Sequence, residues 1–295
     1  MGNFEVISQY SSLISINGRG NLFNFLKKRW DNYGEVGKGN NYIKLNSSSK
    51  ESKTASIFLY TDEPGFFVRK IKDNFVLPHF YLMDGIYLKN QLVIFENGIK
   101  GIVGSIPPHY LKKENIEKQD FNECFIDPLG KVNLNMVGIP LIETIEDEEY
   151  IYGQSIARSS ILAIAEILLA YKEKLNYDFI AFAGQTPMYI ETKSSFNFTI
   201  KPLESKTGKG IIFETGYVTN RKRLKDLLNF AQRWNLNFST TANYYLTREW
   251  ENLMKNKGAI IYLPVENLNT TYEKISTKDL YEISKFLILY GLELS

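Results

Sequence analysis

Cysteine and histidine are nearly absent from this chain of 295 residues, which has one cysteine and two histidines. A single cysteine, Cys124, excludes an intrachain disulfide, and we expect it to behave as a small buried apolar residue. Cys124, His79 and His109 are too few for a Cys/His zinc cluster. No G-x-S-x-G turn accompanies either histidine, so a Ser-His-Asp triad has no support from sequence. A chain of this length can bury a sizeable core without disulfides or metals.

An excess of one charge is also missing, as are long apolar runs. The chain has 35 basic and 33 acidic residues, a formal net charge of +2, and so lacks the basic surplus typical of nucleic-acid binding. No stretch approaches the roughly 18 apolar residues of a membrane-spanning helix. The N-terminus has no basic segment followed by an apolar run, as a signal peptide would. These absences favour a cytoplasmic protein with no membrane span and no nucleic-acid partner.

What the chain does have is an ordinary globular composition, with 44% apolar and 14% aromatic residues. Short runs rich in Ile, Val, Phe and Tyr predict a series of strands in the first half. These runs cover 56–60, 66–71, 81–88, 91–96 and 99–106. The pair Asn97-Gly98 between the last two runs is typical of a tight hairpin turn. A set of antiparallel strands is therefore expected here.

Helical spacing is clearest in the second half of the chain. Apolar residues from 156 to 175 predict a helix of about five turns with one broad buried face. The nearly continuous apolar run 177–183 predicts a strand covered on both faces. A closing helix is expected from 277 to about 291, whereas weak alternation in residues 1–18 favours a strand. Strands followed by a helix-strand-helix unit indicate a mixed α/β or α+β sheet.

Three segments then resemble a known family. The helix at 155–175 leads into the strand Phe179-Ile180-Ala181-Phe182-Ala183. After it, Thr186-Pro187-Met188-Tyr189-Ile190 is similar to a short helix ending in an aromatic residue, and the segment 211–219 is similar to a late strand before a final helix. Together they resemble the GNAT superfamily of N-acetyltransferases, nearest to its acyl-homoserine-lactone synthase and N-acyl amino acid synthase branch.

The resemblance implies a fold and a domain layout. The fold would be α/β (α+β), with a central, mixed, mostly antiparallel sheet flanked by helices. Residues 1–234 would form the GNAT-like acyltransferase domain, with an N-terminal helix at 21–33 and a flexible Gly/Ser-rich loop at 34–54. Residues 235–295 would form a C-terminal strand-helix extension packed on that domain.

The resemblance also implies an activity. An acyl group would move from an acyl-CoA or acyl carrier protein thioester to a small-molecule amine acceptor. Such a reaction needs a base for the amine proton and an acid for the thiolate. The matching positions give Glu143 as the base and Tyr189 as the acid. A plain carboxylate at a strand end is the alternative interpretation of Glu143.

The start of the long helix would hold the donor. Orphan backbone amides and the helix dipole favour anions there, so Gly153, Gln154, Ser155, Ile156 and Ala157 would bind the pyrophosphate or phosphopantetheine. Arg158 would add a charge-assisted contact. Under the alternative interpretation, Ser155 is an ordinary N-cap and Arg158 a solvated charge. The expected co-substrate is an acyl-CoA or acyl-phosphopantetheine thioester, with no metal.

Departures from the family pattern keep other hypotheses open. The family's paired glycines reduce to the single Gly153, and Glu143 is only the nearest carboxylate to its central-strand signature. A non-catalytic GNAT-like protein that binds a partner or ligand is therefore one alternative. A different sheet protein that binds ligands or membranes is another. The basic run 221–225 could dock an acyl carrier protein, or be a solvated helix face.

Overall fold

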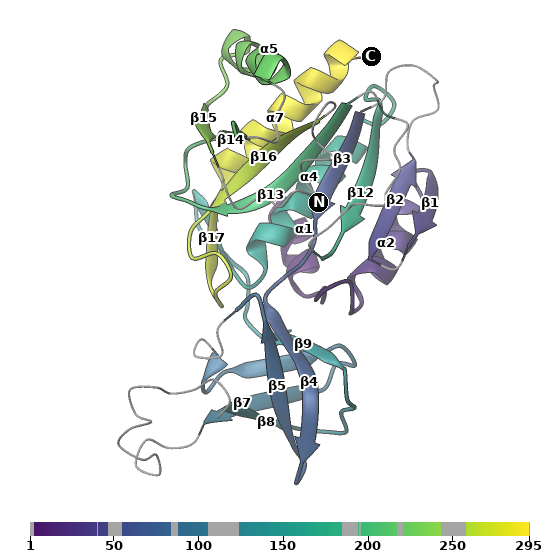
Figure 1. Cartoon of the computed structure of the whole chain (residues 1–295), viewed down its shortest axis with the longest axis vertical. Helices are drawn as coiled ribbons and strands as arrows, with labels where there is room; N and C mark the ends of the chain where they lie inside the picture. The colour runs from purple at the N-terminus through teal and green to yellow at the C-terminus, as the bar shows by residue number, and fades with distance from the viewer. Residues whose placement is uncertain are drawn as a thin grey trace.

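In the computed structural model, the chain folds into an α/β unit and a small β-barrel (Figure 1). The structure describes residues 3–39, 41–46, 55–83, 88–105, 124–184, 194, 196–216, 221–242 and 258–294. None of the helices in these ranges is long and apolar enough to cross a lipid bilayer.

An eight-stranded sheet forms the centre of the α/β unit, in the order β1-β2-β12-β3-β13-β16-β14-β15. Its strands are β1 (Glu35–Lys38), β2 (Tyr42–Asn46), β3 (Ala55–Tyr60), β12 (Tyr177–Phe182), β13 (Phe196–Glu204), β14 (Ile211–Glu214), β15 (Phe238–Thr241) and β16 (Gly258–Val265). The interior strands β12, β3, β13 and β16 run parallel. The side chains of β12 and β16 are buried along their whole length, as expected for parallel strands with both faces covered.

One face of this sheet carries the main apolar core, which includes residues from all five helices of the described chain. These helices are α1 (Asn3–Ser11), α2 (Leu22–Trp30), α4 (Ile156–Leu169), α5 (Arg221–Arg233) and α7 (Thr277–Leu294). Trp30 is fully buried and its ring lies 6.5 Å from that of Phe179 on β12. The opposite face carries a second buried cluster containing Phe58, Phe182 and Tyr262.

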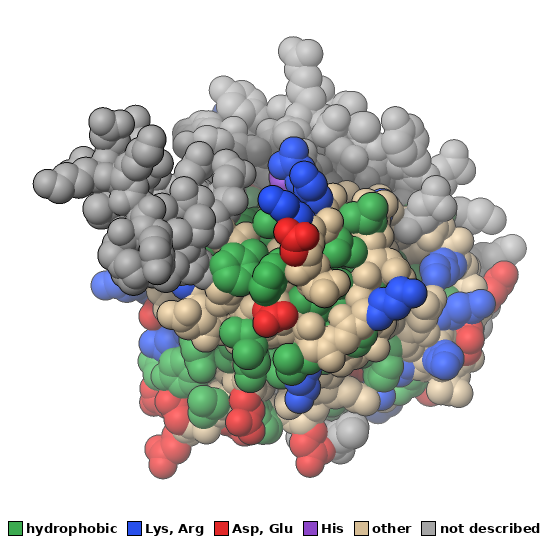
Figure 2. Space-filling model, turned by 90° about the horizontal axis from the view of Figure 1, so that it is seen from below, with side chains coloured by type: hydrophobic (Ala, Val, Ile, Leu, Met, Phe, Trp, Pro, Cys, Tyr) green, Lys and Arg blue, Asp and Glu red, His purple; other side chains and the backbone are tan. Residues whose placement is uncertain are grey.

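A closed six-stranded barrel is inserted between β3 and α4, and lies below the α/β unit in Figure 1. Its strands are β4 (Gly65–Lys72), β5 (Phe75–Tyr81), β6 (Leu92–Phe95), β7 (Lys100–Ser105), β8 (Cys124–Pro128) and β9 (Val137–Pro140). The barrel has its own core, which includes Phe66, Phe95 and the buried Cys124. Figure 2, seen from the barrel side, shows hydrophobic side chains interspersed with acidic and basic ones on that face.

Short elements join the two parts. The strands β10 (Ile145–Glu146), β11 (Tyr150–Gly153) and β17 (Glu273–Ser276) form a small antiparallel sheet next to the start of α4. A buried cluster also packs Ile14 and Ile16, from the loop after α1, against Val137 and Ile139 of β9. The barrel is therefore tied to the loop that follows the first helix.

Several elements match the sequence analysis. The Asn97-Gly98 turn closes the β6–β7 hairpin, with Gly98 at φ +83°, and the expected helices at 156 and 277 are α4 and α7. The strand expected in residues 1–18 is wrong, because residues 3–11 form α1. Val6, Ile7 and Tyr10 are buried at helical spacing there, so tertiary packing overrides the weak alternation.

The mixed α/β class is confirmed, but the finer GNAT-like fold is not. The expected sheet is mostly antiparallel, whereas the observed sheet has four parallel strands at its centre. The antiparallel strands expected beside it belong to the separate barrel. Residues 235–295, expected as an extension, supply β16, which hydrogen-bonds between β13 and β14 inside the large sheet.

Candidate functional site

Two acidic residues follow β3 at the carboxyl end of the parallel strands. Asp62 and Glu63 occupy the short connection from β3 to the first barrel strand, and both are buried. In open α/β sheets, ligands bind beyond the carboxyl ends of the strands. The position of these two carboxylates makes this end of the sheet the candidate site.

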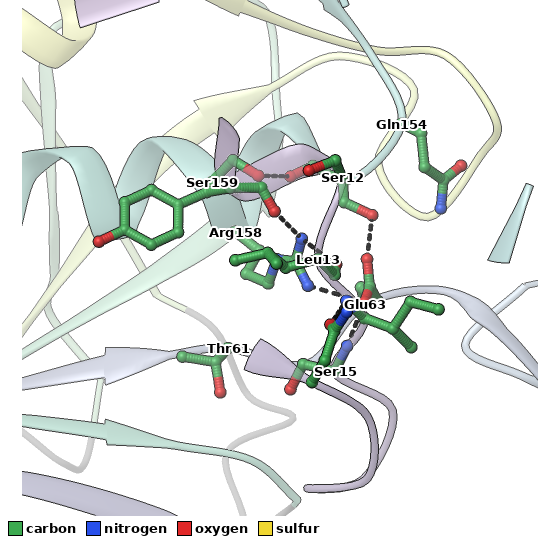
Figure 3. A network of polar contacts seen from close by, with 12 residues as sticks. Ser12, Leu13, Ser15, Thr61, Glu63, Gln154, Arg158 and Ser159 are labelled. Atoms are coloured by element: carbon green, nitrogen blue, oxygen red, sulfur yellow. Dashed lines mark hydrogen bonds and ion pairs between the residues drawn. The ribbon is translucent and has the colours of Figure 1, made fainter. Parts of the chain in front are cut away.

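Glu63 is held in a buried ion pair with Arg158 of α4 (Figure 3). Arg158 Nη1 lies 2.7 Å from Glu63 Oε1, and the exposed fractions of the two side chains are 1% and 0%. The backbone N–H of Ser15 and the hydroxyl of Ser155 donate to the same carboxylate. Burial raises the pKa of Glu63 to about 7, and the neighbouring Arg158 opposes that rise.

The second guanidinium nitrogen of Arg158 fixes the end of α1. Its Nη2 donates to the carbonyl oxygens of Tyr10 at 2.6 Å and of Leu13 at 2.8 Å. The same side chain therefore connects α4, the loop after α1 and the connection into the barrel. Arg158 is a structural clamp in this position, because its fork geometry satisfies three acceptors at once.

A third buried carboxylate, Glu273 of β17, occupies the amino end of α4. Its Oε2 accepts the backbone N–H of Ala157 at 2.9 Å, and its Oε1 accepts that of Asn269 at 3.1 Å. Negative charge is favourable at a helix N-terminus because of the orphan amides and the dipole. Burial raises the pKa of Glu273 to about 7, although both amide hydrogen bonds lower it.

Asp62 is only 5% exposed, and its two carboxylate oxygens differ in their hydrogen bonds. The backbone N–H of Gly184 donates to Asp62 Oδ2 at 2.6 Å, and the Tyr81 hydroxyl donates to it at 2.9 Å. Asp62 Oδ1 has no hydrogen-bond partner in the part of the chain that the structure describes. Burial raises the pKa of Asp62, and the Gly184 amide, the Tyr81 hydroxyl and the nearby backbone amides of Asn17 and Gly18 partly offset the rise.

The three carboxylates line one small cavity of about 10 Å³, enough for a single water-sized group. The full lining is Tyr60, Asp62, Glu63, Pro64, Ser155, Ala157, Arg158, Pro202, Leu268, Asn269 and Glu273. Three carboxylates face one guanidinium in this lining, so the cavity favours a positive group over a negative one when they are ionised. Its wall at Tyr60, Pro202 and Leu268 is partly exposed.

The residues predicted as a donor site have internal partners instead. Ser155 precedes α4 in a left-handed conformation (φ 55°), and its hydroxyl is bound to Glu63. Residues 153–158 are all buried, so Arg158 is not a solvated charge. Glu143 lies exposed in the segment before β10, and Tyr189 falls outside the described residues.

Sequence reasoning missed the residues that the structure brings together. Asp62, Glu63 and Glu273 belong to no motif that marks them in the sequence. A signal did exist, because two acidic residues directly follow an apolar strand at 55–60. Glu273, which is more than two hundred positions away, joins them only through the β11–β17 pairing beside α4.

Solved structures share this fold along nearly the whole chain. A TET aminopeptidase from the marine sediment archaeon Thaumarchaeota archaeon SCGC AB-539-E09 has a TM-score of 0.84 at 15% identity, covering 99% of this chain and 96% of that one. The aminopeptidase APDkam598 from the archaeon Desulfurococcus kamchatkensis also has a TM-score of 0.84, at 16% identity, covering 99% and 94%. An endoglucanase from Thermotoga maritima has a TM-score of 0.79 at 15% identity, covering 97% and 96%.

No family model matches the chain, and no curated protein matches it in sequence. The likeness to solved structures shows the fold alone, because the identities are so low. It is the fold of TET aminopeptidases, so the resemblance to GNAT acyltransferases and the acyl-transfer function drawn from it are wrong. The proposed acid and base roles of Tyr189 and Glu143 in acyl transfer lose their basis with that function.

The cofactor prediction is corrected for the same reason. An acyl-CoA or acyl-phosphopantetheine co-substrate without a metal was implied only by the GNAT resemblance, and it is wrong. Aminopeptidases include enzymes with two-metal sites. Among the described residues, however, no group of three or more His, Cys, Asp or Glu side chains is arranged to hold a metal ion. The acyl carrier protein partner stays a prediction.

The cavity itself also fits a metal poorly. Glu63 is neutralised by Arg158, and both oxygens of Glu273 accept backbone amides. Among the oxygens of these three carboxylates, only Asp62 Oδ1 lacks a hydrogen-bond partner in the described residues. This donor set does not suit a metal ion, so we derive no reaction step through one.

Proposed function

We propose that this protein binds peptides by their N-terminal α-ammonium group, which enters the acidic cavity beside Asp62. The observation that supports this most directly is a cavity lined by three buried carboxylates, one of which, Asp62, has an oxygen without a hydrogen-bond partner among the described residues. A buried acceptor without a partner costs free energy, and a cationic donor removes that cost. Several structural neighbours are aminopeptidases by name, which act at this end of a peptide.

The size of the cavity selects the group that enters it. A volume of about 10 Å³ admits one ammonium group or one water molecule, and excludes a side chain. An ammonium carries three donors, which suits Asp62 Oδ1 together with the remaining lone pairs of Glu63 and Glu273. The rest of the peptide would extend out of the cavity along the partly exposed residues Tyr60, Pro202 and Leu268.

The charges of the cavity predict how binding depends on pH. Burial raises the pKa values of Glu63 and Glu273 to about 7, so both carboxylates lose protons as the pH rises through 7. A peptide α-amino group loses its own charge near pH 7.7–8.0. Affinity should therefore rise from pH 6, reach a maximum between the two titrations, and fall above pH 8.

Hydrolysis of the bound peptide is a second candidate function, which the aminopeptidase neighbours favour. Binding is the first candidate, since Arg158 and backbone amides already engage Glu63 and Glu273 at the cavity. Release of the N-terminal amino acid, measured with and without added Zn²⁺ or Co²⁺, distinguishes the two. Turnover that depends on added metal would show that the protein hydrolyses the peptide, and hydrolysis would then replace recognition as its proposed function.

Calorimetric titration of the full-length protein tests recognition. The probes are a tetrapeptide amide with a free α-amino group and the same peptide N-acetylated. We expect the free peptide to bind about tenfold to a hundredfold more tightly, since one charge-assisted hydrogen bond contributes about 1.5–3 kcal/mol. Equal affinity for the two peptides, or no binding of either, would overturn the proposal.

A matched pair of variants identifies the acceptor. Asp62→Asn keeps the shape and removes the charge, so it should lose most of the preference for the free amine. Asp127→Asn makes the same change at an exposed site on the barrel strand β8 and should keep that preference. Circular dichroism of both variants shows whether the fold survives. Retention of the preference by a folded Asp62→Asn variant would exclude Asp62 as the acceptor.

A further inference from the structure

The cavity beside Asp62 is small enough to distinguish one class of amine from another. Its volume of about 10 Å³ corresponds to a single water-sized group. The nitrogen of a primary ammonium carries three hydrogens and one carbon, so the hydrogens alone enter the cavity. A secondary ammonium, as in proline or an N-methylated residue, carries a second carbon on the nitrogen. That second carbon fits only if the walls of the cavity move apart.

The wall formed by Glu63 is fixed from several directions. Glu63 is fully buried, and its carboxylate accepts a hydrogen bond from Arg158 Nη1 at 2.7 Å. It also accepts the backbone N–H of Ser15 and the hydroxyl of Ser155. Arg158 is itself bound to two carbonyl oxygens at the end of α1 and in the loop that follows. A shift of this wall would therefore disturb α4, that loop and the connection from β3 to the barrel together.

The wall formed by Glu273 is fixed in a similar way. Its carboxylate is buried, and its two oxygens accept the backbone N–H groups of Ala157 and Asn269. Within the small sheet, Glu273 is also paired with Gly153, just before α4. Packed interiors yield little, and an extra methyl group forced into one weakens the state that contains it about fivefold to 150-fold.

The acceptors of the cavity also match a primary ammonium. A carboxylate offers about four acceptor positions. Among the described residues, Asp62 Oδ1 has no hydrogen-bond partner, and the hydrogen bonds named above leave further positions on Glu63 and Glu273. Each of the three carboxylates can thus accept one of the three N–H donors of a primary ammonium. A secondary ammonium has only two such donors.

We propose that this cavity accepts primary ammonium groups only, so that the protein binds peptides with an unsubstituted first residue and rejects those that begin with proline or an N-methylated residue. This inference rests on the peptide recognition proposed above, because it concerns the same cavity. Charge does not make the distinction, since both classes of amine are cationic when protonated. The size of the cavity and the number of its acceptors make it.

Matched peptides test the proposal on the full-length protein. Four tetrapeptide amides differ only in the first residue, which is alanine, N-methylalanine, proline or N-acetylalanine. Calorimetric titration at pH 7, in a buffer free of amines, gives their affinities. We expect the alanine peptide to bind at least about tenfold more tightly than the N-methylalanine and proline peptides. These two should bind as weakly as the acetylated peptide, within about threefold, because their nitrogen does not enter the cavity.

The pattern of affinities separates this proposal from the recognition on which it rests. Equal affinity for the alanine and N-acetylalanine peptides would overturn both. A preference for alanine over N-acetylalanine, with N-methylalanine or proline bound as tightly as alanine, would leave recognition of the ammonium intact. That second result would overturn the restriction to primary amines alone.

The two variants described above locate the discrimination. In Asp62→Asn, the affinity for the alanine peptide should fall to that of the N-methylalanine peptide. Asp127→Asn, on the exposed face of β8, should keep the difference between the two peptides. The comparison of peptides on the unsubstituted protein decides the matter even if Asp62→Asn fails to fold. A folded Asp62→Asn variant that keeps the tenfold difference would also overturn the proposal, because the discrimination would then arise outside this cavity.

Discussion

Replacing Arg158 by methionine should destabilise the protein by about 3–5 kcal/mol at pH 7.5, because it removes one partner of a buried ion pair. Methionine keeps the length and apolar stem of the side chain but leaves the buried Glu63 carboxylate without its cation. It also removes the donors that satisfy the Tyr10 and Leu13 carbonyls at 2.6 and 2.8 Å. Two charges about 4 Å apart at an effective dielectric constant of about 20 give roughly 4 kcal/mol, which agrees with that range.

The same substitution at an exposed pair provides the control. Arg233 pairs with Glu293, but the exposed fractions of these side chains are 60% and 44%. Exposed ion pairs contribute about 0–1 kcal/mol, so Arg233→Met should have a small effect. Urea denaturation followed by circular dichroism measures both variants. A loss below about 1 kcal/mol for Arg158→Met would refute the reasoning.

The pH dependence separates the lost charge from lost packing. Burial raises the pKa of Glu63 to about 7, so at pH 5 this carboxyl is mostly protonated and needs no counter-charge. The penalty of Arg158→Met should therefore shrink at pH 5, by up to about 0.8 kcal/mol. A penalty that is the same at pH 5 and pH 7.5 would show that packing, rather than the ion pair, is lost.

Three further predictions follow from other contacts. The pKa of Glu273 is raised from 4.5 to about 7, so its stabilising contribution is present below pH 4.5 and is lost as the pH rises through 7, by at most about 3 kcal/mol. Glu273→Gln should therefore flatten the fall in stability that urea denaturation measures between pH 5 and 8. An unchanged slope in this variant would contradict the argument. Tyr177→Phe removes a buried hydroxyl that donates to the Leu287 carbonyl at 2.6 Å and should cost about 1 kcal/mol in thermal denaturation, whereas a neutral result would mean that the bond contributes nothing. Trp30→Ala empties a fully buried position and should cost about 3–5 kcal/mol by the same assay, with a value under 1 kcal/mol counting against the core described here.

Periodicity predicted those elements whose packing follows the chain locally. The α4 helix has an almost continuous buried stripe, and the strand at 177 is buried on both faces, so both leave a clear pattern. The hairpin at Gly98 is set by a turn that only a few residue types adopt. These features need no knowledge of distant partners.

Pairing between distant strands was not predictable in the same way. The neighbours of β3 in the sheet are β12 and β13, which lie more than one hundred residues further along the chain. The barrel inserted between them consists of strands that look no different in sequence from those of a larger sheet. Sequential strands were therefore joined into one antiparallel sheet, which led to the wrong fold family.

The candidate site has the same limitation. Arg158 and the start of α4 were singled out as an anion site from the physics of helix ends, and the structure does place a carboxylate there. That carboxylate is Glu273 of the chain itself, whose approach depends on β17 pairing with β11. Single-sequence patterns cannot show that an internal partner already satisfies a helix end.

The most direct test of the central claim is a crystal structure of the protein with a free-amine tetrapeptide amide bound at pH 7.5. The account predicts that the peptide nitrogen lies within hydrogen-bond distance of Asp62 Oδ1, inside the cavity formed with Glu63 and Glu273. A peptide bound with its amino group elsewhere, and with Asp62 Oδ1 still without a contact to it, would contradict the claim.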